Sequence, residues 1–519
     1  MVERASLVLG LVCIVLSTIF ASRHNAKKHR YPPGPPGLPL LGSLLDIPTE
    51  YSWYTFAKWA HEYSTWNYVT QILNAKEIFE ERSRIYSDRF CSAVMESSRN
   101  PTDTVSAHRP PTVMTQELVG WHRNFGLMTY GDVWRQRRRL FNQHFKPQAI
   151  PAHHAKLTQG ARTLTQLLLE SPKKFLKHFH RVPGVTILDI IYAMDLDPQD
   201  DTTIEDLENA ATTFADLADA KGYLVDLIPI LKYLPSWLPG AGFKRQAAKW
   251  KKLVDRLHDE PYHKVKSDIM SGKPRPCIVS ALIHDFEDKL DSSGAEEDIL
   301  SVGATAYTGA DTTTFALANF AFAMLLFPEA QQKAQEELDR VVGRDRLPEI
   351  TDQDSLPYTT ALIRELLRWR PIGPASAIHR STADDWYGDY FIPAGSMVIG
   401  NVWAILHDEE RYPDPEAFKP ERFLTAEGTL DPSVPDPAQV FGFGRRICPG
   451  RFFAHAALFL YISHILAAFT IEKAVDEMGN VVEPTPECEA RTFWRPKPFE
   501  ASFKPRLQGL EGLIHTPRN

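Results

Sequence analysis

The chain has 519 residues and a formal net charge of -7 at pH 7, with 43% hydrophobic and 24% charged residues. These fractions are ordinary for a globular protein, and the acidic balance gives no reason to expect a nucleic-acid partner. Length alone predicts about two to four domains. The cysteines have no paired spacing, which argues against a disulfide framework and indicates a reducing compartment. They are Cys13, Cys91, Cys277, Cys448 and Cys488.

The N-terminal residues predict a membrane anchor. An uncharged, apolar run extends from Ala5 to Ala21, and a basic cluster between Arg23 and Arg30 follows it. A run of about 17 residues is near the lower limit for a helix that spans a bilayer. The positive-inside rule then places the rest of the chain in the cytosol. A cleaved signal peptide is the alternative, which the position of the basic cluster after the apolar run disfavours.

Residues 31–37 (YPPGPPG) predict a stiff, extended hinge, because proline at this density cannot form a helix. Aromatic and apolar spacing predicts a helix over Tyr51–Tyr63 and a second helix over Ala75–Ser83. Only Ser64–Asn74 joins them, with room for one strand. Cys91–Thr115 is rich in Ser, Thr, Pro and Arg and reads as unstructured.

A helix is predicted to begin near Gly131, and in it Trp134 and Arg138 share one face because they lie four residues apart. Arg135, Arg137 and Arg139 are then expected to point away from that face to an outer surface, where they could receive an acidic partner by charge complementarity. Further along, residues 223–243 are apolar, aromatic and interrupted by proline. By themselves they predict a buried loop.

A long apolar helix is predicted over Asp298–Leu326, with the stretch Thr308–Thr313 (TGADTT) in its middle. A glycine flanked by an acid and hydroxyls is unfavourable at mid-helix, and such groupings are often functional. Threonine hydroxyls can bond to the preceding turn and open the helix, so that Asp311 and Thr312 relay protons in the gap. The alternative is a kinked core helix.

Three further patterns follow. A helix over Pro357–Trp369 carries Glu365 and Arg368, a pair that is weak evidence by itself. Downstream lies the stretch Phe418–Phe423 (FKPERF). Short strands are predicted within 390–400 and 492–503.

One cysteine stands out from the other four. The stretch Phe441–Gly450 (FGFGRRICPG) precedes an apolar helix predicted over Phe452–Phe469, so Cys448 lies at a helix N-terminus, where a thiolate is favoured. Its glycines permit close approach of a flat ligand, and Arg446 can pair with a carboxylate on that ligand. A thiolate in this setting suits axial ligation of haem iron.

The stretch matches F-x-x-G-x-R-x-C-x-G at every fixed position and resembles the haem-binding motif of the cytochrome P-450 superfamily, the haem-thiolate monooxygenases. The resemblance covers roughly Pro32 to Arg506 and includes four motifs in the right order. It implies a mainly α fold with small β-sheets around a buried haem, behind an N-terminal transmembrane helix. The implied domains are an anchor (1–22), a basic flank with a Pro-rich hinge (23–50) and a catalytic domain (51–519).

The resemblance also assigns roles to residues. The cofactor is heme b (iron protoporphyrin IX) with Cys448 as axial thiolate ligand. The other cofactor-binding residues are Phe441, Gly442 and Arg446 near the cysteine, with Trp134, Arg138 and His379 (or its neighbour Arg380) toward the propionates. Asp311 and Thr312 match the oxygen-activation motif, although Thr308 stands where the family has Ala or Gly and should crowd the groove. Glu365, Arg368 and Arg422 match a buried structural triad.

The implied activity is a monooxygenase that takes electrons from NADPH-cytochrome P-450 reductase, with cytochrome b5 as a further donor. It would insert oxygen from O₂ into a lipophilic small molecule. The resemblance implies that residues 223–243 form the roof of the substrate pocket, and their apolar character suits such a substrate. The chain most resembles fungal members that tailor secondary metabolites, so a terpenoid or polyketide is expected. The implied location is the endoplasmic reticulum membrane, single-pass, with the catalytic domain cytosolic.

Two alternatives stay open. The connection 64–74 is too short for the two-stranded hairpin usual in the family, and 91–115 is unusually long. The chain is then either truly divergent or mis-spliced in its gene model, and a clipped sheet would give a catalytically impaired haem-binding protein. A haem-thiolate isomerase or dehydratase is the other alternative. Such enzymes do not need the acid–alcohol pair, so Asp311 and Thr312 count against it.

Overall fold

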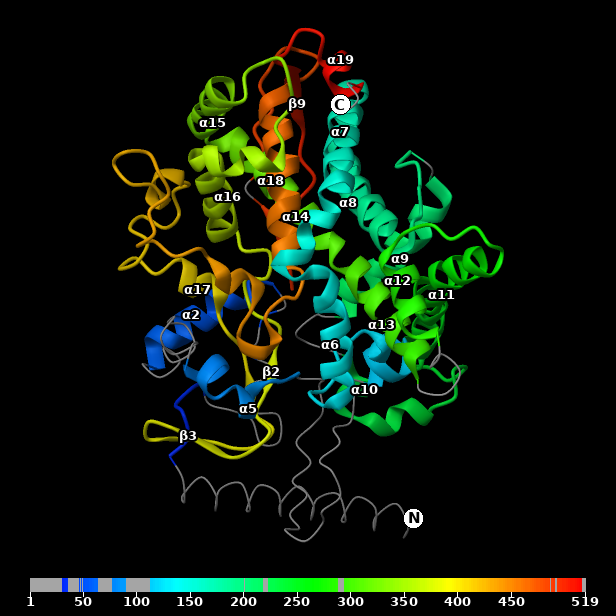
Figure 1. Ribbon diagram of the computed structural model, residues 1–519. Helices are drawn as coiled ribbons and strands as arrows, with labels where there is room; N and C mark the ends of the chain where they lie inside the picture. The colour runs from blue at the N-terminus through cyan, green and yellow to red at the C-terminus, as the bar shows by residue number, and fades with distance from the viewer. Residues whose placement is uncertain are drawn as a thin grey trace, which may run out of the picture. The chain divides into compact units, whose positions relative to one another are not determined.

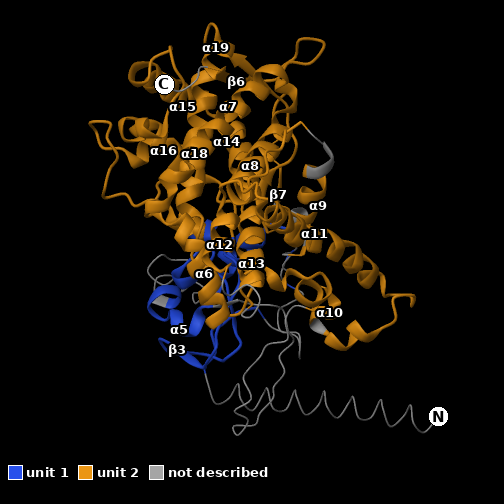
Figure 2. Cartoon of the chain, turned by 45° about the vertical axis from the view of Figure 1, so that its right-hand side comes forward, with its two compact units in different colours: residues 1–90, 375–405, 442–446 blue, residues 91–374, 406–441, 447–519 orange. Residues whose placement is uncertain are grey.

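The computed structural model describes residues 30–35, 46, 48, 50–63, 77–89, 113–199, 201–217, 223–287, 294–485, 487–490 and 492–515. These residues form two compact units (Figure 2). Unit 1 comprises the described parts of 1–90, 375–405 and 442–446. Unit 2 comprises those of 91–374, 406–441 and 447–519.

Unit 2 is mainly helical (Figure 1). Its helices are α6 (Asp132–Phe145), α7 (His154–Glu170), α8 (Phe175–Tyr192), α9 (Asp201–Leu217), α10 (Leu224–Leu227), α11 (Gly242–Met270), α12 (Ile278–Asp285), α13 (Ala295–Thr308), α14 (Ala310–Leu326), α15 (Pro328–Val341), α16 (Pro357–Trp369), α18 (Arg451–Ala468) and α19 (Leu510–His515). Its strands form two antiparallel pairs, β6 (Phe469–Lys473) with β9 (Ala501–Pro505) and β7 (Cys488–Ala490) with β8 (Trp494–Pro496).

The core of unit 2 is built on α14 and α18, which pack against each other and against α8 and α7 respectively. Both helices are apolar on all sides, which is the pattern of a helix surrounded by other elements. Nearly every side chain from Thr313 to Leu325 is buried, as is every one from Ala456 to Ala468. The predicted helices over 357–369 and 452–469 are confirmed to within a residue.

Unit 1 contains α2 (Ser52–Tyr63), α5 (Ser83–Tyr86) and most of α17 (Val402–Leu406). Its three-stranded antiparallel sheet has the order β1 (Asp88–Arg89), β2 (His379–Arg380), β5 (Met397–Val398). A hairpin pairs β3 (Asp385–Tyr387) with β4 (Tyr390–Ile392). The helix expected over 75–83 is wrong in detail, because a π-helical turn at Glu77–Glu81 precedes α5.

Several predicted segments lie outside the described residues. They include the anchor (1–22), most of the basic flank and Pro-rich segment (23–50), the connection 64–74 and nearly all of 91–115, whereas residues 31–35 of the predicted extended hinge are described and contain no helix. Within the described part of the chain, the helix long and apolar enough to cross a membrane is α18, and most of it is buried in the core of unit 2. The expected N-terminal transmembrane helix therefore stays a prediction.

Candidate functional site

Cys448 lies three residues before α18, in the loop that leads into this helix. Its backbone N–H donates to the carbonyl of Phe441 (2.7 Å), which closes the loop, and Arg451 donates to its carbonyl (3.1 Å). The N-terminus of an 18-residue helix carries partial positive charge, which favours a thiolate. The local structure therefore suits Cys448 as an anionic metal ligand.

Arg138 lies beside this loop in unit 2. Its guanidinium donates to the carbonyl of Ile447 (2.6 Å) and lies 5.9 Å from the centre of the Trp134 ring. Burial lowers the pKa of Arg138 to about 10, although the charge of Cys448 acts in the opposite direction. Among the described residues, no carboxylate lies within ion-pairing distance of Arg138. A mostly buried guanidinium of this kind fits a cofactor that brings its own carboxylates, as haem does.

Gly442, Gly444 and Arg446 belong to unit 1. Arg446 is buried, and its Nε donates to the carbonyl of Ser87 (2.5 Å). Gly444 has φ of +53°, and a Cβ at this position would lie 2.0 Å from the carbonyl oxygen of Phe79. Glycine is therefore required at position 444 for both backbone conformation and space.

We expect Gly444→Ala to destabilise the protein far more than Gly272→Ala. Gly272 also has a positive φ (+69°), but a Cβ added there would meet nothing within 4 Å, so that substitution carries only the backbone strain of about 1–2 kcal/mol. The extra loss in Gly444→Ala is the clash with the Phe79 backbone. Thermal unfolding of both variants measures the difference. Equal losses of stability would show that the Phe79 backbone leaves room for a Cβ at position 444.

His379 is buried in strand β2 of unit 1. Its Nδ1 lies 2.6 Å from the carbonyl oxygen of Tyr86, so Nδ1 carries a hydrogen. The Phe79 ring packs on the imidazole, with 4.7 Å between the centres of the two rings. Because Nδ1 is engaged as the donor, Nε2 can donate to a carboxylate only when the ring is an imidazolium.

The predicted long helix is broken where the acid and hydroxyl groups lie. It ends at Thr308 as α13 and resumes at Ala310 as α14, with the Gly309 N–H bonded to the Ala306 carbonyl (3.2 Å). The Thr312 hydroxyl donates to the carbonyl of Gly309 (2.8 Å), the residue that precedes the first turn of α14. Asp311 therefore lies in the first turn of α14, next to a hydroxyl at an opened turn.

Thr308 is held by a contact that the sequence did not indicate. Its hydroxyl donates to the Thr305 carbonyl (2.9 Å) and accepts from the side chain of Asn124 (3.2 Å). The Thr305 hydroxyl in turn accepts from the Phe125 N–H (3.3 Å). The threonine that departs from the family pattern thus fastens the segment around Asn124 to the end of α13.

Glu365, Arg368 and Arg422 are brought together in unit 2. Arg368 donates to both oxygens of Glu365 (2.7 and 2.9 Å), and Arg422 donates to the same carboxylate (3.1 Å). Glu365 and Arg368 are fully buried. The Lys419 N–H also donates to Glu365 (2.8 Å), so the carboxylate joins α16 to the segment that contains Arg422.

One expected orientation is wrong. Arg137 does not face an outer surface, because it is buried and its Nε donates to Asp298 of α13 (2.8 Å). Arg135 and Arg139 are exposed as expected. Sequence reasoning also missed His180 of α8, which lies between Glu208 of α9 and Asp311.

The segment 223–237 is not a buried loop. Its exposed apolar side chains are Leu224, Ile228, Ile230, Tyr233 and Trp237, of which the last is 77% exposed. The segment is nevertheless ordered, since buried Asp226 accepts from the Met114 N–H (2.8 Å) and the Tyr223 N–H (3.1 Å). These side chains form an exposed apolar patch.

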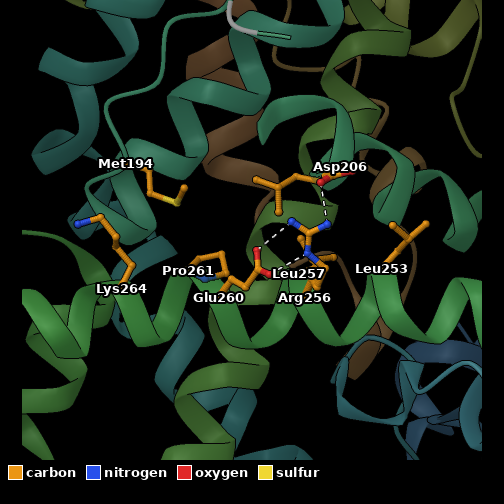
Figure 3. Close-up of a pocket in the computed structure, with 9 residues that line it drawn as sticks. Met194, Asp206, Leu253, Arg256, Leu257, Glu260, Pro261 and Lys264 are labelled. Atoms are coloured by element: carbon orange, nitrogen blue, oxygen red, sulfur yellow. Dashed lines mark hydrogen bonds and ion pairs between the residues drawn. The ribbon is translucent and has the colours of Figure 1, made fainter. Parts of the chain in front are cut away.

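A cavity of about 420 Å³ lies between α9 and α11. Figure 3 shows the side chains that line it. Arg256 at its rim donates to Asp206 and Glu260 (both 2.7 Å), so the charges there compensate one another. None of the predicted site residues lines this cavity.

The comparisons with known proteins agree with one another. The family model "Cytochrome P450" matches residues 32–503. The chain is 36% identical to "Cytochrome P450 monooxygenase ple1" of Rhodocybe pseudopiperita, with 99% of this chain and 96% of that protein aligned. It is 34% identical to "Tryptamine 4-monooxygenase" of Psilocybe cyanescens, with 97% of this chain and 99% of that protein aligned. It is 36% identical to a cytochrome P450 monooxygenase, eriA, of Hericium erinaceus, over 95% and 92% of the two chains.

Proposed function

This chain belongs to the cytochrome P450 family and is a cytochrome P450 monooxygenase, and we propose that it oxidises a lipophilic small molecule with Cys448 as its haem ligand. The family implies a haem-thiolate iron cofactor. When bound, the haem supplies the activation of O₂ and the insertion of one oxygen atom into the substrate. The remaining steps depend on side chains of this chain.

Cys448, as a thiolate, would hold the iron, and the N-terminus of α18 stabilises its negative charge. Arg138 would bind a propionate, which supplies the carboxylate that it lacks among the described residues. His379, as an imidazolium, would bind a propionate through Nε2. Arg446 would help to retain the cofactor. We assign Phe441 and Gly442 to the shape of the loop, since Phe441 accepts the Cys448 N–H.

Asp311 and Thr312 would hold and pass on the protons that the reaction consumes, with the Asp311 carboxyl as the acid and the Thr312 hydroxyl beside it. The observation that best supports turnover with O₂ is the opened turn at Gly309, because it places a carboxylate and a hydroxyl at a helix break. A general acid must lie within hydrogen-bonding reach of its target, directly or through one water molecule. An isomerase or dehydratase that uses no O₂ does not need this pair.

The carbon monoxide difference spectrum of the reduced, full-length protein tests the haem assignment. A Soret band at the long wavelength typical of thiolate ligation is expected. The second part of the test is NADPH-dependent O₂ consumption with a P450 reductase. A neutral-ligand band, or no O₂ consumption by a correctly ligated protein, would refute the proposal.

We propose a fungal secondary metabolite as the substrate. Relatives named as monooxygenases come from fungi, and one of them is named for tryptamine. The exposed apolar patch on 223–237 suits a lipophilic compound that partitions into membranes. The electron donor would be NADPH-cytochrome P450 reductase, with cytochrome b5 as a further donor. Exposed Arg135 and Arg139 can attract an acidic partner.

We further propose that the chain is held at the endoplasmic reticulum membrane by 1–22 and that the exposed apolar patch contacts the lipid. In vesicles that contain brominated acyl chains, the tryptophan fluorescence of the full-length protein should be quenched. Trp237→Phe should remove most of this quenching, because Trp237 is 77% exposed and the anchor contains no tryptophan. Trp386→Phe is the matched control, since Trp386 is 48% exposed in unit 1. Unchanged quenching in Trp237→Phe would exclude lipid contact at this patch.

A further inference from the structure

Asp311 is part of a chain of charged side chains that joins three helices. His180 Nε2 lies 3.5 Å from Asp311 Oδ1, and His180 Nδ1 lies 2.9 Å from Glu208 Oε1. The imidazole thus lies between a carboxylate of α14 and a carboxylate of α9. Arg181, the next residue of α8, also approaches Glu208 (3.7 Å). No motif in the sequence connects these residues.

The register of α8 against α14 is fixed next to this chain of charges. Pro183 lies inside α8 and has no N–H, so the Phe179 carbonyl loses its usual helical partner. The hydroxyl of Thr314 donates to this carbonyl (3.1 Å), and both groups are buried. Thr314 lies one turn after Asp311 and Phe179 precedes His180. The same contact that satisfies the free carbonyl therefore brings His180 to Asp311.

The charges around His180 favour its protonated form. Burial alone lowers the pKa of His180, but its close contacts with Asp311 and Glu208 and the charges of both carboxylates raise it to about 9. On its own helix, Arg181 is directed to Glu208. On α13, Tyr307 faces the two carboxylates, and burial followed by their charges raises its pKa, so it stays neutral.

We propose that His180 is the positioning residue for Asp311: its imidazolium, anchored by Glu208, holds the Asp311 carboxylate in one orientation beside the helix break. This inference rests on the proposed role of Asp311 in proton delivery and deepens it. Glu208 belongs to α9, so a displacement of α9 would weaken the hold on Asp311. Proton delivery at the break is thereby coupled to the position of α9.

The first test measures the interaction itself and needs no turnover. Apparent unfolding temperatures of His180→Gln, Asp311→Asn and the double variant form a cycle. Both single variants should unfold at lower temperature than the wild-type protein, and the double variant should be hardly less stable than the worse of the two. Because the folded-state pKa of His180 is raised from 6.5 to about 9, its stabilisation is complete below pH 6.5 and is lost as the pH rises through 9. The difference in unfolding temperature between the wild-type protein and His180→Gln should therefore become smaller as the pH rises through 9.

His178→Gln is the matched control, because it removes an imidazole from the same helix. His178 bonds to the carbonyl (3.1 Å) and hydroxyl (2.9 Å) of Ser171, away from α9 and α14. Burial lowers its pKa below the usual value, so its contribution should not change between pH 6.5 and 10. Additive effects of His180→Gln and Asp311→Asn, or a pH response shared by His178→Gln, would overturn the proposal.

The second test measures the consequence for oxygen chemistry, again without a known substrate. When proton delivery is faulty, O₂ takes up two electrons from NADPH, through the reductase, and two protons, and is released as H₂O₂ instead of being used for oxidation. The ratio of H₂O₂ formed to NADPH consumed, with reductase, should change in the same direction in His180→Gln and Asp311→Asn. His180→Arg, which keeps the positive charge, should restore part of the wild-type ratio. His178→Gln should leave it unchanged.

The outcomes distinguish the proposed role of Asp311 from the positioning role of His180. If Asp311→Asn leaves the ratio unchanged, the proposed role of Asp311 fails, and with it this inference. If Asp311→Asn changes the ratio and His180→Gln does not, only the positioning role fails. The positioning role stands if both change it and the stability cycle shows coupling.

Discussion

Cys448→Ser is expected to abolish the long-wavelength band of the carbon monoxide difference spectrum and to lower monooxygenase turnover by orders of magnitude. A serine hydroxyl remains neutral in the same loop, so it cannot provide the anionic sulfur that favours O–O cleavage. The fold itself should survive, because the Cys448 backbone contacts to Phe441 and Arg451 do not involve the side chain. Difference spectra normalised to folded protein measure the effect.

Cys277→Ser is the matched control. Cys277 precedes α12, and its sulfur accepts the Ser280 N–H (3.3 Å) as a helix cap. Serine is a better cap than cysteine, so this variant should keep the band and lose no stability. Loss of the band in Cys277→Ser, or its retention in Cys448→Ser, would show that Cys448 is not the ligand.

The elements that the sequence predicted well are those with a strong local signal. Helix α16 has an amphipathic pattern and α18 a continuous apolar one, and both were placed within a residue. The break at Gly309 follows from a glycine next to side chains that compete for backbone hydrogen bonds. Such features depend on neighbours in the chain, so one sequence is enough to find them.

The errors concern partners that are distant in sequence. Trp134 and Arg138 share a helix face as predicted. Helix periodicity could not show, however, that Arg137 is buried and paired with Asp298, which lies 161 residues away in the chain. Likewise, His180 lies far from Asp311 in the chain. Their contact lies next to the Phe179 carbonyl, which Pro183 leaves without a helical donor and which Thr314 of α14 satisfies. Pro183 within α8 was the available signal, because a proline inside a helix frees a carbonyl that another group must satisfy.

Glu365→Gln is expected to lower the free energy of unfolding by about 3–5 kcal/mol, which is the usual cost of removing one partner of a buried ion pair. The amide would leave the fully buried Arg368 without its counter-charge, while Arg422 and the Lys419 N–H would lose a strong acceptor. Other contacts of Arg368 remain, since it also donates to the carbonyls of Leu406 (3.0 Å) and Pro415 (2.8 Å). These bonds hold the guanidinium in place but do not neutralise it.

The same substitution at Glu421 provides the control. Glu421 pairs with Lys333 (2.6 Å), but both side chains are about half exposed, so Glu421→Gln should change stability by no more than about 1 kcal/mol. Thermal or denaturant unfolding of both variants tests the contrast between a buried and an exposed carboxylate. Equal losses would mean that Glu365 is not the charge on which this part of unit 2 depends.

A Glu365→Gln protein that folds normally but fails in turnover would instead show that the triad acts on the chemistry. The described partners of the triad argue against such a role, since they lie in α16 and in residues 406–422 rather than in α14.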